Sequence, residues 1–224
     1  SHAICSRHIL TKKGPSLPLT ETKTFNQRLI MVATKSNMLP IGTKAPFFTL
    51  QDVITKKEIE LSANKAGKGL LVAFICNHCP FVIHLIEHLS LSFNALLDQD
   101  IEVYAISSND IDRYPQDSPE KMVELAEKYG FLFPYLYDSG QTVAHSFQAA
   151  CTPDFFLFND QQNLFYRGRY DATRPGSDER VNGKDLLGAV GSMLNHQDPP
   201  VNQSPSIGCN IKWTAENEPA YFKS

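Results

Sequence analysis

An unbroken apolar segment in the first half of the chain is the strongest structural signal in the sequence. Residues 70–75 are all apolar and show no alternation, which predicts a strand buried on both faces. Apolar residues then recur at helical spacing from Val82 to Leu97, which predicts an amphipathic helix. Pro80 suits the first helical position, where its missing N–H costs no hydrogen bond. Residues 76–79 therefore join a central strand to a helix.

Similar patterns predict the other elements of the domain. Alternating segments at 48–50 and 59–61 flank a polar turn and predict an N-terminal β-hairpin. The remaining predicted elements are strands at 101–106, 133–137, 155–158 and 164–168 and helices at 118–129, 141–149 and 186–194. Because strands alternate with helices before a closing hairpin, we expect an α/β fold with a central mixed sheet flanked by helices.

The chain divides into three predicted parts. Residues 1–37 have no clear periodicity and are expected to form a flexible N-terminal arm. Residues 38–197 contain every predicted strand and helix and form the domain. Residues 198–224 are rich in Pro, Asn, Gln and Ser and are expected to be an extended tail that packs on the domain, anchored by Trp213. The sequence contains no glycine-rich phosphate-binding motif, so no cofactor is predicted.

Composition limits the partners and the compartment. The 224 residues are 42% hydrophobic with a net charge of −3, which gives no reason to expect a nucleic acid or an acidic membrane surface as a partner. No stretch approaches the ~20 apolar residues of a membrane span, and the N-terminus lacks the apolar core of a secretory signal. We expect a cytoplasmic monomer or homodimer with mostly free cysteines, although a mature periplasmic protein would look the same.

Cys76 and Cys79 lie at the predicted junction of strand and helix. A helix N-terminus favours a thiolate over a thiol, and the two-residue spacing lets two cysteines close a small disulfide ring. Cys76, outside the helix, is the predicted nucleophile, and Cys79 is the predicted resolving thiol. His78 between them could lower the pKa of Cys76 further. Metal sites use the same spacing, so an alternative is a non-enzymatic metal-binding or interaction protein that uses Cys76, His78 and Cys79. If the two cysteines are instead a disulfide-forming pair, no metal is predicted.

Several motifs resemble a known family. The segments are Ile41–Leu50, Cys76–Val82, Ile106–Asp110, Tyr114–Pro119, Cys151–Phe155 and Ser206–Trp213. Together they resemble the thioredoxin fold, its alkyl hydroperoxide reductase/thiol-specific antioxidant (AhpC/TSA, redoxin) branch and, more narrowly, a peroxiredoxin-like bacterial family.

The resemblance implies a site and an activity. It makes Cys76 and Cys79 a redox pair and Pro153 a cis proline that faces the pair, with the backbone of Thr152 exposed to bind a substrate peptide. The implied function is a thiol–disulfide oxidoreductase that acts on a disulfide-containing protein or a small thiol, with a thioredoxin- or glutathione-type electron donor. A thiol-dependent peroxidase that acts on peroxide is the alternative, but the peroxiredoxin motif Pro-x-x-x-Thr/Ser-x-x-Cys ends at neither cysteine.

For the other cysteines and two histidines, a purely structural role is weighed against a functional one. Cys151 is expected near the redox pair as a small buried residue, with a third-thiol role open. Cys209 is either an inert tail residue or a resolving or regulatory thiol folded back over the site. Cys5 is expected to be incidental. His84 and His88 have a spacing that can bind metal on one helix face, but solvated surface histidines are expected.

Overall fold

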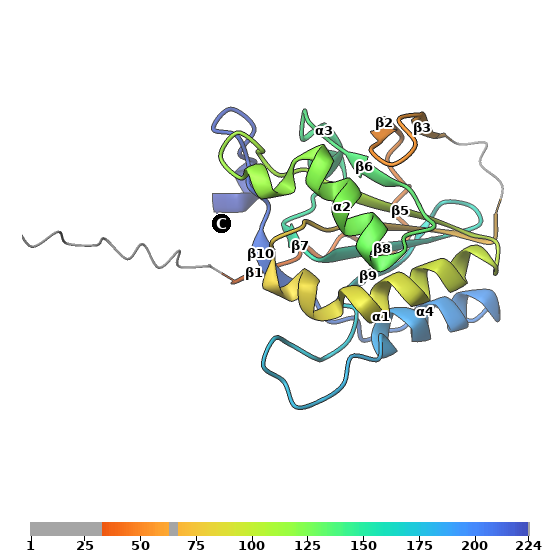
Figure 1. Cartoon of the computed structure of the whole chain (residues 1–224). Coiled ribbons are helices and arrows are strands. Elements are labelled where there is room, and N and C mark those ends of the chain that lie inside the picture. Colours follow the sequence, from red (N-terminus) through yellow and green to blue (C-terminus); the bar gives the residue numbers. More distant parts are fainter. Residues whose placement is uncertain (1–32, 63–66, 224) are drawn as a thin grey trace, which may run out of the picture. The chain divides into compact units, whose positions relative to one another are not determined.

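The order of the strands of the main sheet and of the four helices agrees with the sequence pattern (Figure 1). The structure is a computed structural model that describes residues 33–62 and 67–223. The strands are β1 (Ala33–Lys35), β2 (Phe48–Asp52), β3 (Glu58–Leu61), β4 (Gly69–Phe74), β5 (Ile101–Ser107), β6 (Tyr135–Tyr137), β7 (Cys151–Thr152), β8 (Asp154–Asn159), β9 (Leu164–Gly168) and β10 (Ile207–Asn210). The helices are α1 (Pro80–Leu97), α2 (Pro119–Tyr129), α3 (Thr142–Ser146) and α4 (Lys184–Leu194), with 3-10 turns η1 (Pro115–Asp117) and η2 (Ala220–Lys223).

Seven strands form the predicted mixed sheet, in the order β3-β2-β6-β5-β4-β8-β9. The central strands β4, β5 and β6 are parallel, whereas β8 pairs antiparallel with β4 and β9 antiparallel with β8. Every residue of β4 is buried, as its unbroken apolar run predicts. The predicted hairpin at 48–50 and 59–61 is confirmed as β2–β3.

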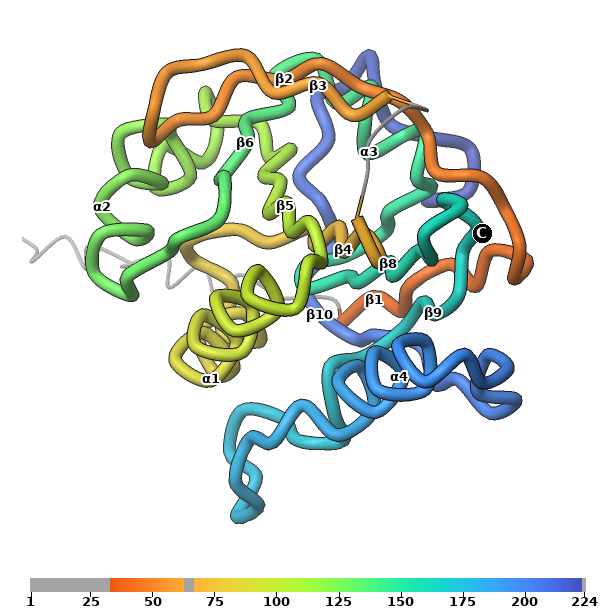
Figure 2. Tube along the Cα trace, turned by 90° about the vertical axis from the view of Figure 1, so that its right-hand side faces the viewer, coloured from red at the N-terminus to blue at the C-terminus, as the bar shows by residue number. Residues whose placement is uncertain are grey.

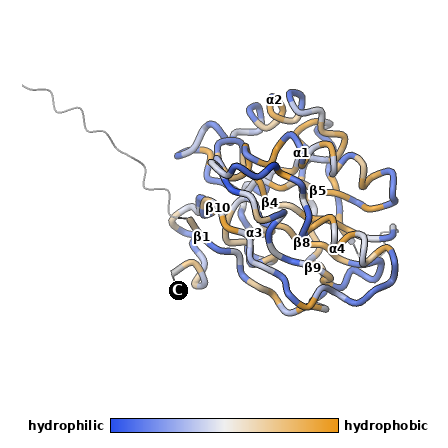
Figure 3. Tube along the Cα trace, turned by 90° about the horizontal axis from the view of Figure 1, so that it is seen from below, coloured by the Kyte–Doolittle hydropathy of each residue, from blue (hydrophilic) through white to orange (hydrophobic). Residues whose placement is uncertain are grey.

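Helices cover both faces of this sheet. Successive side chains of β4, and of the residue that follows it, therefore pack alternately in two hydrophobic cores, one on each face. Leu71, Ala73 and Ile75 pack with buried residues of α1, α2 and α4. The intervening side chains Leu70, Val72 and Phe74 pack on the other face with α3 and the C-terminal segment. Figure 2 shows α1 and α4 on one side of β4 and β8 and α3 on the other. Figure 3 shows hydrophilic segments mainly in the outer loops.

Helix α1 is central to the first core. Its buried face includes Val82, Leu89 and Phe93. In the described part of the chain it is the one helix long and apolar enough, by length and composition, to cross a membrane, contrary to the expectation that no stretch comes close. The core helix of a folded domain passes the same test, and α1 buries its apolar face against the sheet, which accounts for its composition.

A second, three-stranded sheet changes the predicted division of the chain. Its order is β1-β10-β7, and both pairings are antiparallel. Residues 33–37, predicted to belong to the flexible arm, lie in or directly after β1, and Ser36 exchanges hydrogen bonds with Ser206. Part of the predicted extended tail is the middle strand β10 of this sheet. Residues 1–32 of the predicted arm, including Cys5, lie outside the described residues.

The C-terminal end of helix α2 depends on a residue in a left-handed backbone conformation. Gly130 ends the helix in the left-handed region at φ 65°, directly after the predicted helix of residues 118–129, and nothing lies within 4 Å of a Cβ added there. Gly130→Ala should therefore lower the free energy of unfolding by about 1–2 kcal/mol through conformational cost alone. Chemical denaturation measures this value. A loss well above that range would mean that packing, and not backbone conformation, limits this position.

Candidate active site

The two motif cysteines occupy the loop between β4 and α1. Cys79 is the N-cap of α1, and its carbonyl oxygen accepts hydrogen bonds from Val82 and Ile83 at 3.0 Å each. Pro80 occupies the start of the helix, as predicted. Cys76 is 1% exposed and Cys79 is 0% exposed, and both are free thiols. Both sulfur atoms are therefore covered by the surrounding protein.

Thr152 joins the two cysteines from across the fold. Its hydroxyl oxygen lies 3.3 Å from the Cys76 sulfur, and its carbonyl oxygen accepts a 3.1 Å hydrogen bond from the Cys79 thiol. The Thr152–Pro153 peptide bond is cis, as the resemblance implied. Four predicted site residues, Cys76, Cys79, Thr152 and Pro153, thus meet at one point, where β7 reaches the first turn of α1.

Strand β10 corrects the expectation that the Thr152 backbone is exposed. Thr152 is paired with Cys209, and Asn210 with Cys151, in the antiparallel β7–β10 ladder. The segment of backbone that was expected to bind a substrate peptide is therefore occupied by the protein's own chain. The tail could not be placed there from the sequence, because a four-residue strand with Gly208 at its second position carries no clear alternation.

The contacts around the two sulfur atoms shift the pKa values of Cys76 and Cys79 in opposite directions. The Cys209 thiol, the Cys76 thiol and the backbone N–H groups of Cys209 and Val82 donate hydrogen bonds to the Cys79 sulfur, and together they hold the pKa of Cys79 well below its usual range despite burial. Burial, its hydrogen bond to Cys79 and the charge of Asp117 raise the pKa of Cys76. The donors on the Cys79 sulfur therefore favour its thiolate over that of Cys76, against the hydrogen bond that the protonated Cys79 thiol donates to the Thr152 carbonyl oxygen.

A buried carboxylate organises the loop between the cysteines. Asp117, which is fully buried, accepts hydrogen bonds of 2.8 Å from the Asn77 backbone N–H and from the Asn109 side chain. His78 Nδ1 lies 2.7 Å from Asp117 Oδ2, but off the line of an aligned hydrogen bond, so this contact is an ion pair when His78 is protonated. The His78 ring also stacks on Tyr114, with centroids 5.7 Å apart. His78 is thus held beside Asp117, and its predicted action on Cys76 stays a prediction.

The same residues are the strongest candidate for a metal site in the described part of the chain. Cys76, His78 and Asp117 each offer one ligand atom, and these atoms lie within 4.8 Å of one another. The two oxygens of Asp117 are already engaged by Asn77, Asn109 and His78. A metal would have to replace these contacts, so we interpret the group as a hydrogen-bonded framework that positions the cysteine loop.

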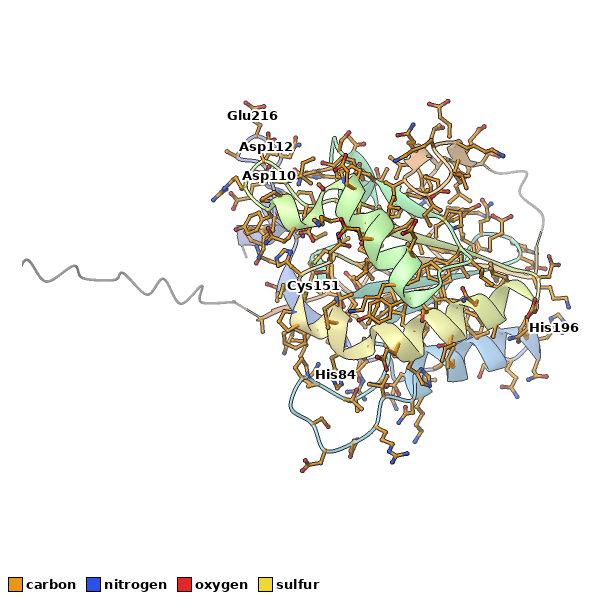
Figure 4. The ribbon with its side chains drawn as sticks, in the orientation of Figure 1. His84, Asp110, Asp112, Cys151, His196 and Glu216 are labelled. Atoms are coloured by element: carbon orange, nitrogen blue, oxygen red, sulfur yellow. The ribbon has the colours of Figure 1, made fainter. Side chains whose placement is uncertain are left out.

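Cys151 and the pair His84 and His88 also have defined places in the structure. Cys151 (labelled in Figure 4) lies at the end of α1 that carries Cys79, and its pKa is raised by burial and by the charges of Asp154 and Cys79. Its expected burial is confirmed. His84 and His88 are half-buried, and each has a hydrogen-bond partner as well as contact with solvent: His84 Nε2 lies 2.9 Å from Thr173 Oγ1, and His88 Nδ1 lies 2.7 Å from the Tyr170 hydroxyl.

Sequence reasoning missed the supporting residues of the site. Asp117, Asn109 and Tyr135 were not singled out, although the Tyr135 hydroxyl donates a 3.0 Å hydrogen bond to Asn77. One signal was available for Asn109, because it lies two residues after β5, the parallel neighbour of β4. The carboxyl ends of parallel strands meet at one edge of a sheet, so the position of Asn109 in the sequence could have placed it near the cysteine loop.

Comparison with known proteins gives three kinds of match. A model of the AhpC/TSA family matches residues 41–167. The structure of an uncharacterized conserved protein from Geobacillus kaustophilus is 43% identical, with a TM-score of 0.80, covering 83% of this chain and 98% of that chain. A hypothetical protein from Sinorhizobium meliloti is also 43% identical, with a TM-score of 0.79, covering 81% of this chain and 99% of that chain.

Matches to named oxidoreductases are more distant. Thiol-disulfide oxidoreductase ResA from Halalkalibacterium halodurans is 27% identical over 124 residues, which is 55% of this chain and 65%, less than two thirds, of that relative's length. The thioredoxin domain of a thiol-disulfide oxidoreductase from Bacteroides vulgatus has a TM-score of 0.53 at 20% identity, covering 70% of this chain and 100% of that chain. At that identity the likeness concerns the fold, and the predicted thioredoxin-like fold is confirmed.

Proposed function

The chain belongs to the AhpC/TSA family, and we propose that it is a thiol–disulfide oxidoreductase that works through Cys76 and Cys79. One observation supports the proposal above all. Two buried thiols at a strand–helix junction share Thr152 as a partner, and hydrogen bonds to the Cys79 sulfur lower the pKa of that thiol. A purely structural pair of cysteines has no need of such charge stabilisation, whereas thiol–disulfide exchange depends on it.

The first chemical step is assigned to Cys79. Its thiolate attacks one sulfur of a substrate disulfide, so that a mixed disulfide forms and the other substrate sulfur leaves as a thiolate that takes a proton from solvent. This step removes the negative charge of Cys79. That charge is one cause of the raised pKa of Cys76, so ionisation of Cys76 becomes easier once Cys79 has reacted.

Cys76 then completes the cycle. It attacks the Cys79 sulfur, the Cys76–Cys79 disulfide forms, and the second substrate sulfur leaves as a thiolate. The substrate is thereby reduced by two electrons and the protein oxidised by two. A thioredoxin- or glutathione-type donor would restore the dithiol by the reverse exchange. We propose disulfide-containing proteins or small disulfides as substrates, in keeping with the similarity to the thiol-disulfide oxidoreductase ResA.

Catalysed reduction of a protein disulfide tests the proposal. With dithiothreitol as electron source, the wild-type protein should accelerate the reduction of insulin. Cys79→Ser should lose this turnover, and Cys76→Ser should turn over more slowly than wild type. Cys151→Ser is the matched control, because it removes a buried thiol that takes no part in the proposed cycle, and it should retain the wild-type rate. If both variants of the motif cysteines reduced insulin as fast as wild type, the proposed function would be wrong.

A further inference from the structure

The third strand of the small sheet brings another thiol to the Cys79 sulfur. In the register of β10 on β7, Cys209 lies opposite Thr152, the residue whose hydroxyl and carbonyl oxygens contact Cys76 and Cys79. On its other edge Cys209 is paired with Ala33 of β1. Cys209 is thus held in the middle strand of a sheet, between two hydrogen-bonded neighbours, and not in a free tail.

Direct contacts join Cys209 to Cys79. The Cys209 thiol and its backbone N–H both donate hydrogen bonds to the Cys79 sulfur. Cys209 is 2% exposed and belongs to the same buried cluster as Cys76 and Cys79. The Cys79 sulfur therefore has two thiol neighbours, Cys76 and Cys209, and both are shielded from solvent.

The close approach of β10 depends on a residue without a side chain. A Cβ built on Gly208 would overlap the carbonyl oxygen of Thr152 and come within 3.1 Å of the Pro153 ring. Glycine at this position lets β10 lie directly against the turn that contacts both motif cysteines. The strand occupies the backbone position at which a substrate strand was expected to pair, and it presents a cysteine there.

We propose that β10 acts as an internal substrate strand and that Cys209 is a second disulfide partner of Cys79. The inference rests on the proposed function, in which Cys79 enters a disulfide with Cys76. The Cys209 thiolate attacks the Cys79 sulfur, a Cys79–Cys209 bond forms, the Cys76–Cys79 bond breaks, and Cys76 leaves as a thiolate that takes up the proton lost by Cys209. The exchange conserves electrons and needs no further oxidant.

The charges around Cys209 favour this order of events. While Cys79 is a thiolate, its hydrogen bond and its charge, together with burial, raise the pKa of Cys209 and keep that thiol protonated. Once Cys79 is part of a disulfide, this charge is absent. Lys212, whose positive charge lowers the pKa of Cys209, then favours the Cys209 thiolate. Oxidation of Cys79 thus removes the main obstacle to attack by Cys209.

Disulfide mapping after removal of Cys76 tests the proposal. The Cys76→Ser protein is treated with oxidised glutathione, free thiols are alkylated, and peptides are mapped by mass. Glutathione forms a mixed disulfide with Cys79, which the neighbouring Cys209 resolves, releasing the second glutathione as a thiol. Because a tethered thiol has an effective concentration of about millimolar or more, the internal Cys79–Cys209 disulfide should predominate at lower glutathione concentrations.

Matched variants separate the possible outcomes. Cys76→Ser/Cys209→Ser should retain glutathione on Cys79, and Cys76→Ser/Cys151→Ser should form the Cys79–Cys209 disulfide as readily as Cys76→Ser. Retention of glutathione on Cys79 with Cys209 still free, or a Cys79–Cys151 disulfide, would overturn the inference. Cys76→Ala is a second background if the serine variant does not fold.

Wild-type protein in the same experiment distinguishes this inference from the proposed function. If the wild-type protein forms the Cys76–Cys79 disulfide but Cys76→Ser forms no Cys79–Cys209 disulfide, the internal partner is wrong and the proposed function stands. If Cys79 enters no disulfide in either protein, both are wrong.

Discussion

Cys79→Ser should reduce the rate of reaction with a small disulfide by roughly 10³-fold or more, because serine offers no thiolate at the position where the site stabilises one. Cys76→Ser should react with the disulfide at close to the wild-type rate in the first step, although it cannot complete the cycle through Cys76. The measurement is the rate of mixed-disulfide formation with oxidised glutathione, followed by quenching and intact mass. The reverse result, a fast Cys79→Ser and a slow Cys76→Ser, would restore Cys76 as the attacking thiol.

The pH dependence of that first step follows from the same contacts. A thiol of ordinary pKa, about 8.5, loses about tenfold in thiolate for each pH unit below it. The hydrogen bonds from Cys209 and Cys76 hold the pKa of Cys79 below its usual range, so its thiolate persists as the pH falls. The rate should therefore change little between about pH 8 and pH 5. A tenfold fall per unit across that range would contradict the assignment.

Gly208→Ala should have the second large effect, because it adds a Cβ where Thr152 and Pro153 leave no space. Displacing β10 removes donors from the Cys79 sulfur and uncovers it. We expect a loss of about 1–3 kcal/mol in the free energy of unfolding, typical of overpacking. We also expect alkylation of Cys79 to become at least about tenfold faster, which corresponds to a change of about 1.4 kcal/mol in the barrier.

A glycine elsewhere supplies the control for that variant. Gly188 lies in α4, and a Cβ there meets nothing within 4 Å, so Gly188→Ala should leave the alkylation of Cys79 unchanged and stabilise the helix by up to about 1 kcal/mol. Peptide mapping after timed alkylation measures both variants. Equal reactivity of Cys79 in Gly208→Ala and Gly188→Ala would mean that β10 does not control access to the site.

Most of the main sheet could be predicted because its signals are local. The apolar run at β4 and the helical spacing in α1 each reflect burial within a short segment. The two motif cysteines could be placed at the strand–helix junction for the same reason. The Thr152–Pro153 turn was located by resemblance and not by pattern.

The small sheet and the order of the thiols could not be predicted in this way. Strands β1, β7 and β10 are two to four residues long, and they pair over long sequence separations. The pattern of residues within so short a strand does not indicate which distant strand it pairs with. The pKa of Cys79 depends on Cys209, which reaches it only through that sheet. Position relative to the helix therefore predicted Cys76 as the attacking thiol. The tertiary contacts instead lower the pKa of Cys79, which is why we propose Cys79 for this role.

Intact-mass analysis of the wild-type protein with peptide mapping tests the central claim most directly. The protein is fully reduced, exposed to oxidised glutathione, alkylated and digested, and the oxidation is then reversed with dithiothreitol. We expect a reversible loss of two hydrogens. The disulfide should join Cys79 to Cys76, and Cys209 should be the only other disulfide partner of Cys79. If Cys79 remained a free thiol while Cys76, Cys151 or Cys209 became oxidised, the assignment of Cys79 as the reactive thiol would be contradicted.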